Sequence, residues 1–197
     1  MLKLLKFRIL LVLLILIPYN VLAQTSEEFI KTVTQQASSI LMQNISKEQK
    51  SQELIELAKT NVDIRAIGLY TLGKHKKNLS ENQLKEFEEL FYEYFLKTFS
   101  SRLSEYSDPK INVISQKIIN EKYTIVSSIL VAEEKRPEIE IDWRVYTKNP
   151  DQLVIRDLII GGLSLARMQR EEFGSVIQSS NGDINVLFNN LREFNSK

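Results

Sequence analysis

The chain has 197 residues and carries 26 Lys and Arg against 25 Asp and Glu, so its formal net charge is +1. It contains no cysteine and a single histidine, which excludes disulfides, thiolate metal sites, cysteine nucleophiles and histidine clusters. A charge this close to zero offers no general attraction to nucleic acid, and no glycine-rich strand-to-helix turn is present for nucleotide phosphates. We therefore expect no nucleic-acid partner, no cofactor and no metal.

The first 23 residues are typical of a cleavable secretory signal. Three cations within the first eight residues precede the apolar run 9–17, Pro18 follows, and the segment ends in Val21-Leu22-Ala23. The run is shorter than the roughly 20 apolar residues that a membrane-spanning helix needs, which disfavours the alternative of a retained anchor. We expect cleavage after Ala23, and loss of the three cations leaves a net charge of −2 on residues 24–197.

The N-terminal half of the remaining chain is predicted to be helical. Apolar residues at helical spacing begin at Phe29 and predict the first helix. Ser46 and Ser80 are each followed three residues later by a glutamine, a capping box that begins a helix. The helix from Ser80 is the third and longest, and it runs to about Tyr106, because Asp108-Pro109 prevents its continuation.

After Pro109 the apolar residues change to the period-two spacing of β-strands. This spacing predicts four strands, at residues 111–119, 123–132, 138–146 and 153–160. Their short connections favour antiparallel pairing. Gly161-Gly162 ends the predicted sheet, and helices follow at about 163–178 and 183–194. The predicted organisation is a signal peptide (1–23) and one domain (24–197), with a helical part (24–108), a sheet (110–161) and C-terminal helices (163–195).

The predicted strands differ in how their two faces are composed. In the third strand, apolar residues occupy one face and charged residues the other; the apolar ones are Ile139, Ile141, Trp143 and Val145. The second and fourth strands carry apolar residues on both faces, with Ile125, Ile129, Leu158 and Ile160 among them. Such strands are either covered on both sides or line an apolar cavity with one side.

Two titratable residues are candidate catalytic groups. His75 lies in the basic segment 73–77 between predicted helices, where we expect a solvated loop rather than a catalytic triad; its neighbouring lysines suit anionic headgroups as well. Asp157 interrupts the apolar fourth strand, either as a general base or as a structural partner of an arginine. We favour the structural role, with Arg156, Arg144 or Arg170 as the candidate partners, because structural ion pairs perturb pKa values just as catalytic sites do.

An aromatic stripe at helical spacing marks the longest helix. It comprises Phe87, Phe91, Tyr94, Phe95 and Phe99. Such a stripe is by default packed core, and the alternative is one wall of a cavity for acyl chains. The spacing alone does not separate these two interpretations.

Two stretches together resemble a known family. The first contains Asp63, Leu72-Gly73, Ser80 with Gln83, Phe87 with Phe91, Thr98-Phe99, Leu103 and Tyr106. The second is residues 155–165, followed by Arg170 and Phe173. With the signal peptide and the order of elements, they resemble the MlaC, or toluene-tolerance, family of periplasmic phospholipid-binding proteins in the pathway that maintains outer-membrane lipid asymmetry. The chain departs from the family pattern at Lys76, Leu153, Gly161 and Gln169.

The resemblance implies an α+β fold in which a twisted antiparallel sheet is wrapped by helices around an apolar tunnel. The four predicted strands would form this sheet, and phospholipid acyl chains would lie in the tunnel with the headgroup outside. The residues expected to line it are Phe91, Phe95, Phe99, Ile125, Ile129, Ile139, Ile141, Trp143, Leu158, Ile160, Leu163 and Leu165.

The resemblance also implies a function and partners. A carrier of this family would shuttle phospholipid through the periplasm between an outer-membrane lipoprotein–porin complex and an inner-membrane ABC transporter with an MCE-domain subunit, and it would not be an enzyme. Two alternatives remain open at this point. One is a small cone-fold enzyme that uses Asp157 as its general base. The other is a periplasmic adaptor protein whose sheet and long helix are ordinary core.

Overall fold

The computed structural model describes residues 24–132 and 137–197, so the predicted signal peptide, residues 1–23, lies outside the described residues. The helices are α1 (Ser26–Met42), α2 (Lys47–Asn61), α3 (Ile64–Thr71), the 3-10 helix η1 (Gly73–Asn78), α4 (Glu81–Leu103), α5 (Leu165–Ser179) and α6 (Ile184–Ser196). The strands are β1 (Ile111–Asn120), β2 (Tyr123–Leu130), β3 (Ile139–Tyr146), β4 (Val154–Ile160) and β5 (Leu163–Ser164). Among the described residues, no helix is both long and apolar enough to span a membrane.

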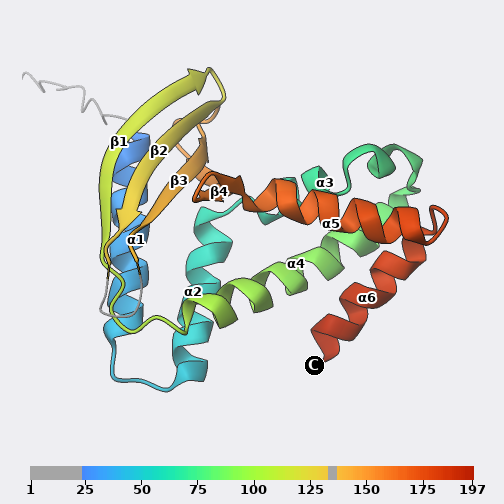
Figure 1. Ribbon diagram of the computed structural model, residues 1–197, viewed down its shortest axis with the longest axis horizontal. Coiled ribbons are helices and arrows are strands. Elements are labelled where there is room, and N and C mark those ends of the chain that lie inside the picture. Colours follow the sequence, from blue (N-terminus) through green and yellow to red (C-terminus); the bar gives the residue numbers. More distant parts are fainter. Residues whose placement is uncertain (1–23, 133–136) are drawn as a thin grey trace, which may run out of the picture.

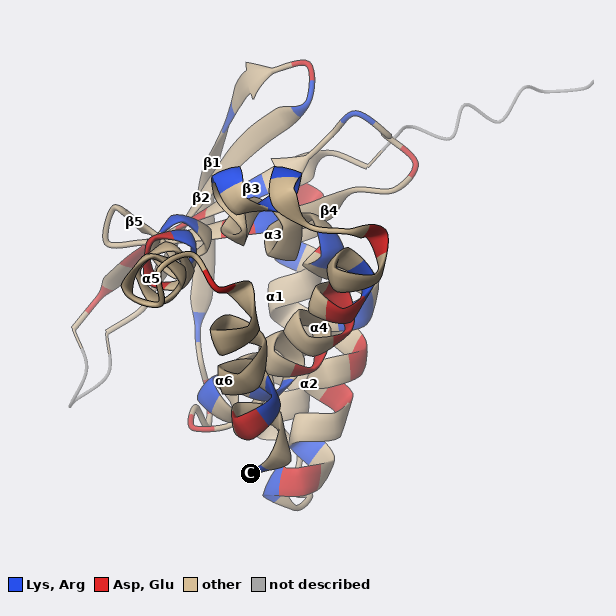
Figure 2. Cartoon of the chain, turned by 90° about the vertical axis from the view of Figure 1, so that its right-hand side faces the viewer, with Lys and Arg blue, Asp and Glu red and all other residues tan. Residues whose placement is uncertain are grey.

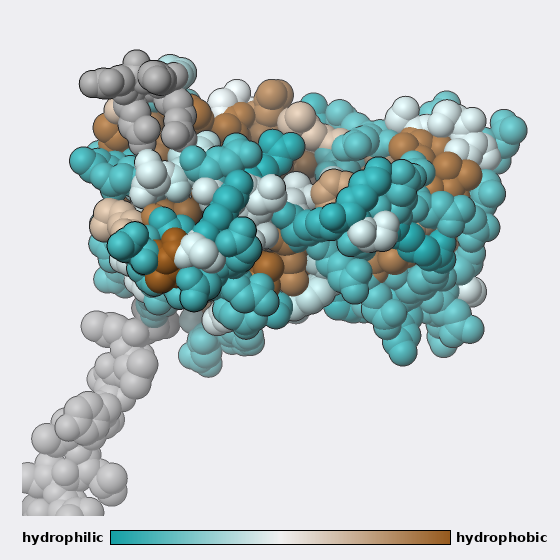
Figure 3. Space-filling model, turned by 90° about the horizontal axis from the view of Figure 1, so that it is seen from below, coloured by the Kyte–Doolittle hydropathy of each residue, from teal (hydrophilic) through white to brown (hydrophobic). Residues whose placement is uncertain are grey.

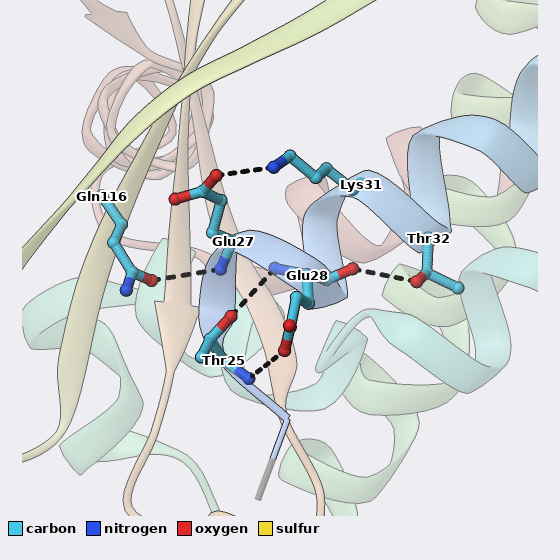
Figure 4. A network of polar contacts seen from close by, with 6 residues as sticks. All are labelled: Thr25, Glu27, Glu28, Lys31, Thr32 and Gln116. Carbon is cyan, nitrogen blue, oxygen red and sulfur yellow. Dashed lines mark hydrogen bonds and ion pairs between the residues drawn. The ribbon is translucent and has the colours of Figure 1, made fainter.

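Capping boxes begin three of the helices. Those predicted at Ser46 and Ser80 are present, and each hydroxyl accepts a hydrogen bond from the backbone N–H of the glutamine three residues later. A third, which was not predicted, begins α1: Thr25 Oγ1 accepts from the Glu28 backbone N–H, and the Glu28 carboxylate accepts from the Thr25 N–H (Figure 4). The backbone N–H of Glu27 donates to the Gln116 side chain at 3.1 Å, which fastens this end of α1 to β1.

Residues 64–78 contain one helix that was not predicted and one segment whose predicted conformation was wrong. Residues Ile64–Thr71 form α3, a helix that was not predicted, with Asp63 as its N-cap accepting from the Ala66 backbone N–H at 3.0 Å. The basic segment around His75 was expected to be a loop and is the 3-10 helix η1. Both helices are short, so they give too few turns for apolar periodicity to register.

The sheet has five antiparallel strands in the order β1-β2-β3-β4-β5, one more than predicted. The additional strand, β5, is the two residues Leu163 and Ser164, which turn back on β4 after Gly161 and Gly162. Both glycines have positive φ, 55° and 82°, a conformation that side chains with a Cβ adopt rarely. Helix α5 therefore begins at Leu165 rather than at residue 163, with Ser164 as its N-cap.

Helices cover the two faces of the sheet unequally (Figure 1). Helix α1 lies along β1 and β2, whereas α2, α3 and α5 contact β4. Helices α4 and α6 pack against each other on the side away from β1. The close neighbours of β3 are chiefly the strands on either side of it.

The buried apolar side chains form two main clusters. In the sheet cluster, α1 contributes Phe29, Ile30 and Val33, and the sheet contributes Val126, Val145 and Ile155. The helical cluster contains residues of all the α-helices from α2 to α6. It is built around four phenylalanines: Phe87, Phe91, Phe173 and Phe188. Val62, which follows α2, packs against both clusters and forms an isolated bridge with Ile155.

Candidate functional site

One face of the sheet is apolar across β3, β4 and β5. Residues paired across antiparallel strands point to the same side of a sheet. Trp143 pairs with Leu158, Ile141 with Ile160, and Ile160 with Leu163, so these side chains share the face that β3 was predicted to make apolar. We call it the apolar face. Six of the twelve predicted tunnel residues lie on it: Ile139, Ile141, Trp143, Leu158, Ile160 and Leu163.

The apolar face changes along its length from closed core to partly open surface. Val145 is completely buried under α1, and Ile141, four residues earlier in β3, is 9% exposed. Ile160, which pairs with Ile141, is half-buried, and Leu163 beside it is 60% exposed. The face therefore continues past the sheet cluster into apolar surface that the protein itself leaves partly uncovered.

The polar groups on the apolar face are satisfied within it. The Trp143 indole N–H donates to Ser128 Oγ at 2.8 Å, and Ser128 Oγ lies 3.1 Å from the Ile141 backbone carbonyl, to which it donates. Burial of a tryptophan usually requires a partner for its N–H. Since these groups bond one another, the face presents hydrocarbon outward.

Ile125 and Ile129 lie on the opposite face of the sheet. They pair with Arg144 and Glu140, so their side chains point with the charged residues of β3. The residues of β2 that do share the apolar face are Thr124, Val126, Ser128 and Leu130, all of them buried. The structure therefore does not bring Ile125 and Ile129 together with the other predicted tunnel residues of the sheet.

The predicted aromatic stripe of α4 belongs to the helical cluster. Phe91 is buried, stacked on Phe87 at 5.7 Å between ring centroids and edge-on to Phe173 at 6.2 Å. Phe95 and Phe99 are half-buried and stack on each other at 5.9 Å. Tyr94 donates its hydroxyl to Gln169 at 2.9 Å, and burial raises the pKa of that phenol. Leu165 is 42% exposed in the first turn of α5.

Two surface hollows do not involve the predicted tunnel residues. One lies along α3 and α4 and is lined by charged side chains, with Arg65, Lys85 and Glu88 among them. The other lies between α1 and α2 and is lined mainly by polar side chains such as Gln35 and Glu53. Neither hollow therefore belongs to the apolar face. Apolar side chains also reach the surface in several patches spread along the long axis (Figure 3).

The sequence matches the family model described as MlaC protein over residues 24–193. The chain belongs to the MlaC family. Its fold is similar to that of a solved structure, the phospholipid-binding protein from Ralstonia solanacearum in complex with a phospholipid, with a TM-score of 0.73 and 17% sequence identity. The similarity covers 88% of this chain and 98% of the other. A comparison with curated proteins finds no match.

In this MlaC-family chain, Asp157 joins β4 to the start of α5. The carboxylate is 4% exposed and accepts hydrogen bonds from Ser164 Oγ at 2.6 Å and from the Ala166 backbone N–H at 3.0 Å. Of the three arginines considered as partners, only Arg144 lies within ion-pair distance, at 4.0 Å. The carboxylate therefore accepts its hydrogen bonds from groups at the start of α5, which supports a structural role.

The other two arginines are held elsewhere. Arg156 donates to the Asp63 carboxylate at 2.7 and 2.9 Å and lies over the Tyr146 ring. Burial acts to lower the pKa of Arg156, but hydrogen bonds to Tyr123 and Asp63 outweigh this and raise it. Arg170 lies over the Tyr70 ring. The pair of Asp63 and Arg156 ties the start of α3 to β4, close to the bridge formed by Val62.

Residues that could do acid–base or metal chemistry are dispersed. His75 is half-buried in η1, and its backbone N–H donates to the Leu72 carbonyl. Within residues 24–132 and 137–197, no group of three or more His, Asp and Glu side chains is arranged to hold a metal ion.

Proposed function

We propose that this protein is a non-enzymatic phospholipid carrier of the periplasm, which holds acyl chains against the apolar face. The observation that carries the proposal is the extension of this face beyond the closed core, from Ile141 to Leu163. Membership of the MlaC family and the phospholipid in the complex of the Ralstonia solanacearum protein support it. The proposed site is smaller than the sequence predicted and consists of Ile139, Ile141, Trp143, Leu158, Ile160 and Leu163.

The chemistry of acyl chains fits such a site. Each CH₂ group removed from water contributes about 0.8 kcal/mol, so a long acyl chain binds a dry apolar wall without specific polar contacts. The headgroup would remain at the solvent side, near the exposed Leu163. We expect little selectivity among headgroups, because the described residues of the apolar face include no cluster of polar groups positioned to bind one.

The cellular role follows from the family. We propose that the N-terminal segment is a signal peptide cleaved after Ala23 and that the exported chain shuttles phospholipid between an outer-membrane lipoprotein–porin complex and an inner-membrane ABC transporter with an MCE-domain subunit. The charged start and apolar run of residues 1–23 support export. N-terminal sequencing of exported material should begin at Gln24.

Two adjacent isoleucines provide a matched test of the binding site. Ile160 points to the apolar face, where it pairs with Ile141, whereas Ile159 pairs with Asp142 on the opposite face; both are half-buried. Wild-type protein purified without detergent from the periplasm of a Gram-negative host should carry nearly one diacyl phospholipid per chain. Ile160→Asn should lose most of it, because it places an amide against the acyl chains, and Ile159→Asn should retain it.

The measurement is mass spectrometry of organic extracts, normalised to protein, with circular dichroism to establish that both variants are folded. Wild-type protein without lipid after gentle extraction would favour the adaptor interpretation. Equal lipid in the two folded variants would move the site away from this face.

A further inference from the structure

The hairpin of β1 and β2 exposes large apolar side chains at an edge of the sheet. β1 is the first strand in the sheet order, and the turn that joins it to β2 projects from the body of the molecule (Figure 1). Ile118 is 75% exposed, the largest value among the large apolar side chains of the described residues. Ile114 and Ile119 are also more than half exposed. In an ordinary strand with one solvated face, isoleucines would be expected on the other face, which packs against the core.

Two irregularities in β1 affect Ile114 and Ile119, whereas Ile118 keeps its partner, Thr124, and so points to the side of the sheet that carries the apolar face. The pairing of β1 with β2 shifts between Val113 and Ser115 and again between Ile118 and Asn120, which leaves Ile114 and Ile119 without partners on β2. A bulge of this kind inserts an extra residue and re-aims side chains. It also bends an edge strand, which hinders the addition of another strand from a partner protein. The side chains of this hairpin are therefore a better recognition surface than its backbone edge.

Three lysines lie at the same end of the sheet as the exposed Ile118 and Ile119. Lys117 precedes Ile118, and Lys122 lies in the turn after it. The Thr147 backbone N–H donates to the Lys122 carbonyl at 2.9 Å, which brings Lys148 to the same end of the sheet. The acidic residues of the two turns at this end are Glu121 and Asp151, so cations are in excess, and the charges of the hairpin end are visible in Figure 2. Among the ion pairs between described residues, none involves these five side chains.

We propose that this hairpin end, defined as Lys117, Ile118, Ile119 and Lys122, contacts the surface of an anionic phospholipid bilayer. Apolar side chains flanked by lysines suit the boundary between headgroups and acyl chains, where the hydrocarbon is buried and the ammonium groups meet phosphates. The proposal rests on the proposed function only in that an exported lipid carrier works beside membranes. The hairpin end is distant along the strands from the cargo site, because Ile118 pairs with Thr124 whereas Ile141 pairs with Ser128.

The test is flotation of the exported protein, expressed from the full chain and purified from the periplasm, with two kinds of vesicle. One kind contains phosphatidylglycerol in phosphatidylcholine, and the other contains phosphatidylcholine alone. Wild-type protein should float with the anionic vesicles and less with the neutral ones, and high salt should reduce its binding. The double variant Ile118→Ser with Ile119→Ser should lower the partition about tenfold or more, since it removes two exposed apolar side chains.

Two control variants isolate the contribution of the hairpin end. Ile118→Leu with Ile119→Leu keeps the hydrocarbon and should bind vesicles as the wild type does. Ile114→Ser removes an exposed isoleucine of the same strand that lies farther from the turn, and it should have a smaller effect. All variants should retain the co-purified lipid of the wild type, so loss of vesicle binding is distinguishable from failure of the cargo site.

Three results would overturn the proposal. The first is wild-type protein that floats with neither kind of vesicle. The second is a double serine variant that floats as well as the wild type. The third is a double serine variant that loses its co-purified lipid, because Ile118 and Ile119 would then belong to the cargo site. If wild-type protein ignores vesicles but forms dimers that depend on Ile118, measured by light scattering, the surface is a contact between copies of the chain instead.

Discussion

At the scale of single residues, the carboxylate of Asp157 illustrates how a buried charge can be structural. It lies in an apolar strand, and such a position can belong to a general base as well as to a structural anchor. Its two short hydrogen bonds go to the Ser164 hydroxyl and the Ala166 N–H, which are the groups that must be satisfied where α5 begins. The carboxylate thus replaces water at a buried helix start, and no described histidine lies in this arrangement.

This arrangement predicts the effect of removing the carboxylate. Asp157→Ala leaves the buried Ala166 N–H and the Ser164 hydroxyl without their acceptor, which should lower the free energy of unfolding by about 2–3 kcal/mol. Asp142→Ala is the matched control, because Asp142 accepts a single hydrogen bond, from Ser127 Oγ, and is less buried; its cost should be about 1 kcal/mol.

Urea denaturation of both variants measures these losses. Lipid per folded chain should not change in Asp157→Ala, since the residue is not on the apolar face. The structural role would be contradicted if Asp157→Ala were as stable as the wild type, or if it abolished a measurable turnover while the protein remained folded.

At the scale of elements, the sequence predicts helices and strands where a local signal is strong. The capping boxes at Ser46 and Ser80 and the strict alternation of β3 locate their elements, because each depends on residues close together in the chain. Helix α3 and strand β5 were not predicted, since both are short. The start of α3 is fixed by a contact with a residue distant in sequence, because the Asp63 carboxylate accepts hydrogen bonds from Arg156, and β5 is only two residues that turn back on β4. Short elements of this kind carry no periodicity of their own.

The faces of β2 could not be assigned from the sequence for a related reason. Isoleucine at 125 and 129 makes that face look as apolar as the face of Val126 and Leu130, so hydrophobicity does not decide which one meets the core. The pairing with β3 decides it, because Ile125 lies opposite Arg144 and Val126 opposite Trp143. A register between two strands is a tertiary property, and a shift by one residue would exchange the faces.

Substitutions at two positions on the same face of β3 can distinguish the closed core from the proposed binding site. Val145→Glu buries an unpaired carboxylate in the completely closed sheet cluster and should cost several kcal/mol, enough to prevent folding or expression. Ile141→Glu lies on the same strand and face, but toward the open end, where water can reach the carboxylate. It should fold with a modestly lowered melting temperature and without phospholipid.

Thermal denaturation followed by circular dichroism and lipid extraction distinguish these outcomes. A folded Ile141→Glu protein with full lipid would remove this position from the site. An unfolded one would place Ile141 in the core with Val145.

At the scale of the whole molecule, the two hydrophobic clusters account for the shape of the protein. The sheet cluster and the helical cluster share Val62, and the ion pair of Asp63 with Arg156 lies beside it. The part of the apolar face beyond the sheet cluster is covered by neither, so the chain alone leaves hydrocarbon in contact with water there. A ligand that buries this hydrocarbon should make the folded protein more stable than it is without the ligand.

Bound phospholipid should therefore raise the melting temperature of the protein. A ligand that binds only the folded state stabilises it by RT ln(1 + [L]/Kd), about 2.7 kcal/mol at a hundredfold excess over Kd. For a domain of this size, 1 kcal/mol shifts the melting temperature by about 2–4 °C, so gentle removal of lipid should lower it by about 5–10 °C. Differential scanning calorimetry of lipid-bound, stripped and reloaded protein measures the shift. Ile160→Asn serves as the internal control, since it should melt near the stripped wild type and should not respond to added phospholipid. Identical melting temperatures for lipid-bound and stripped wild-type protein would show that the apolar face is already closed without a ligand, and they would argue against its role as the cargo site.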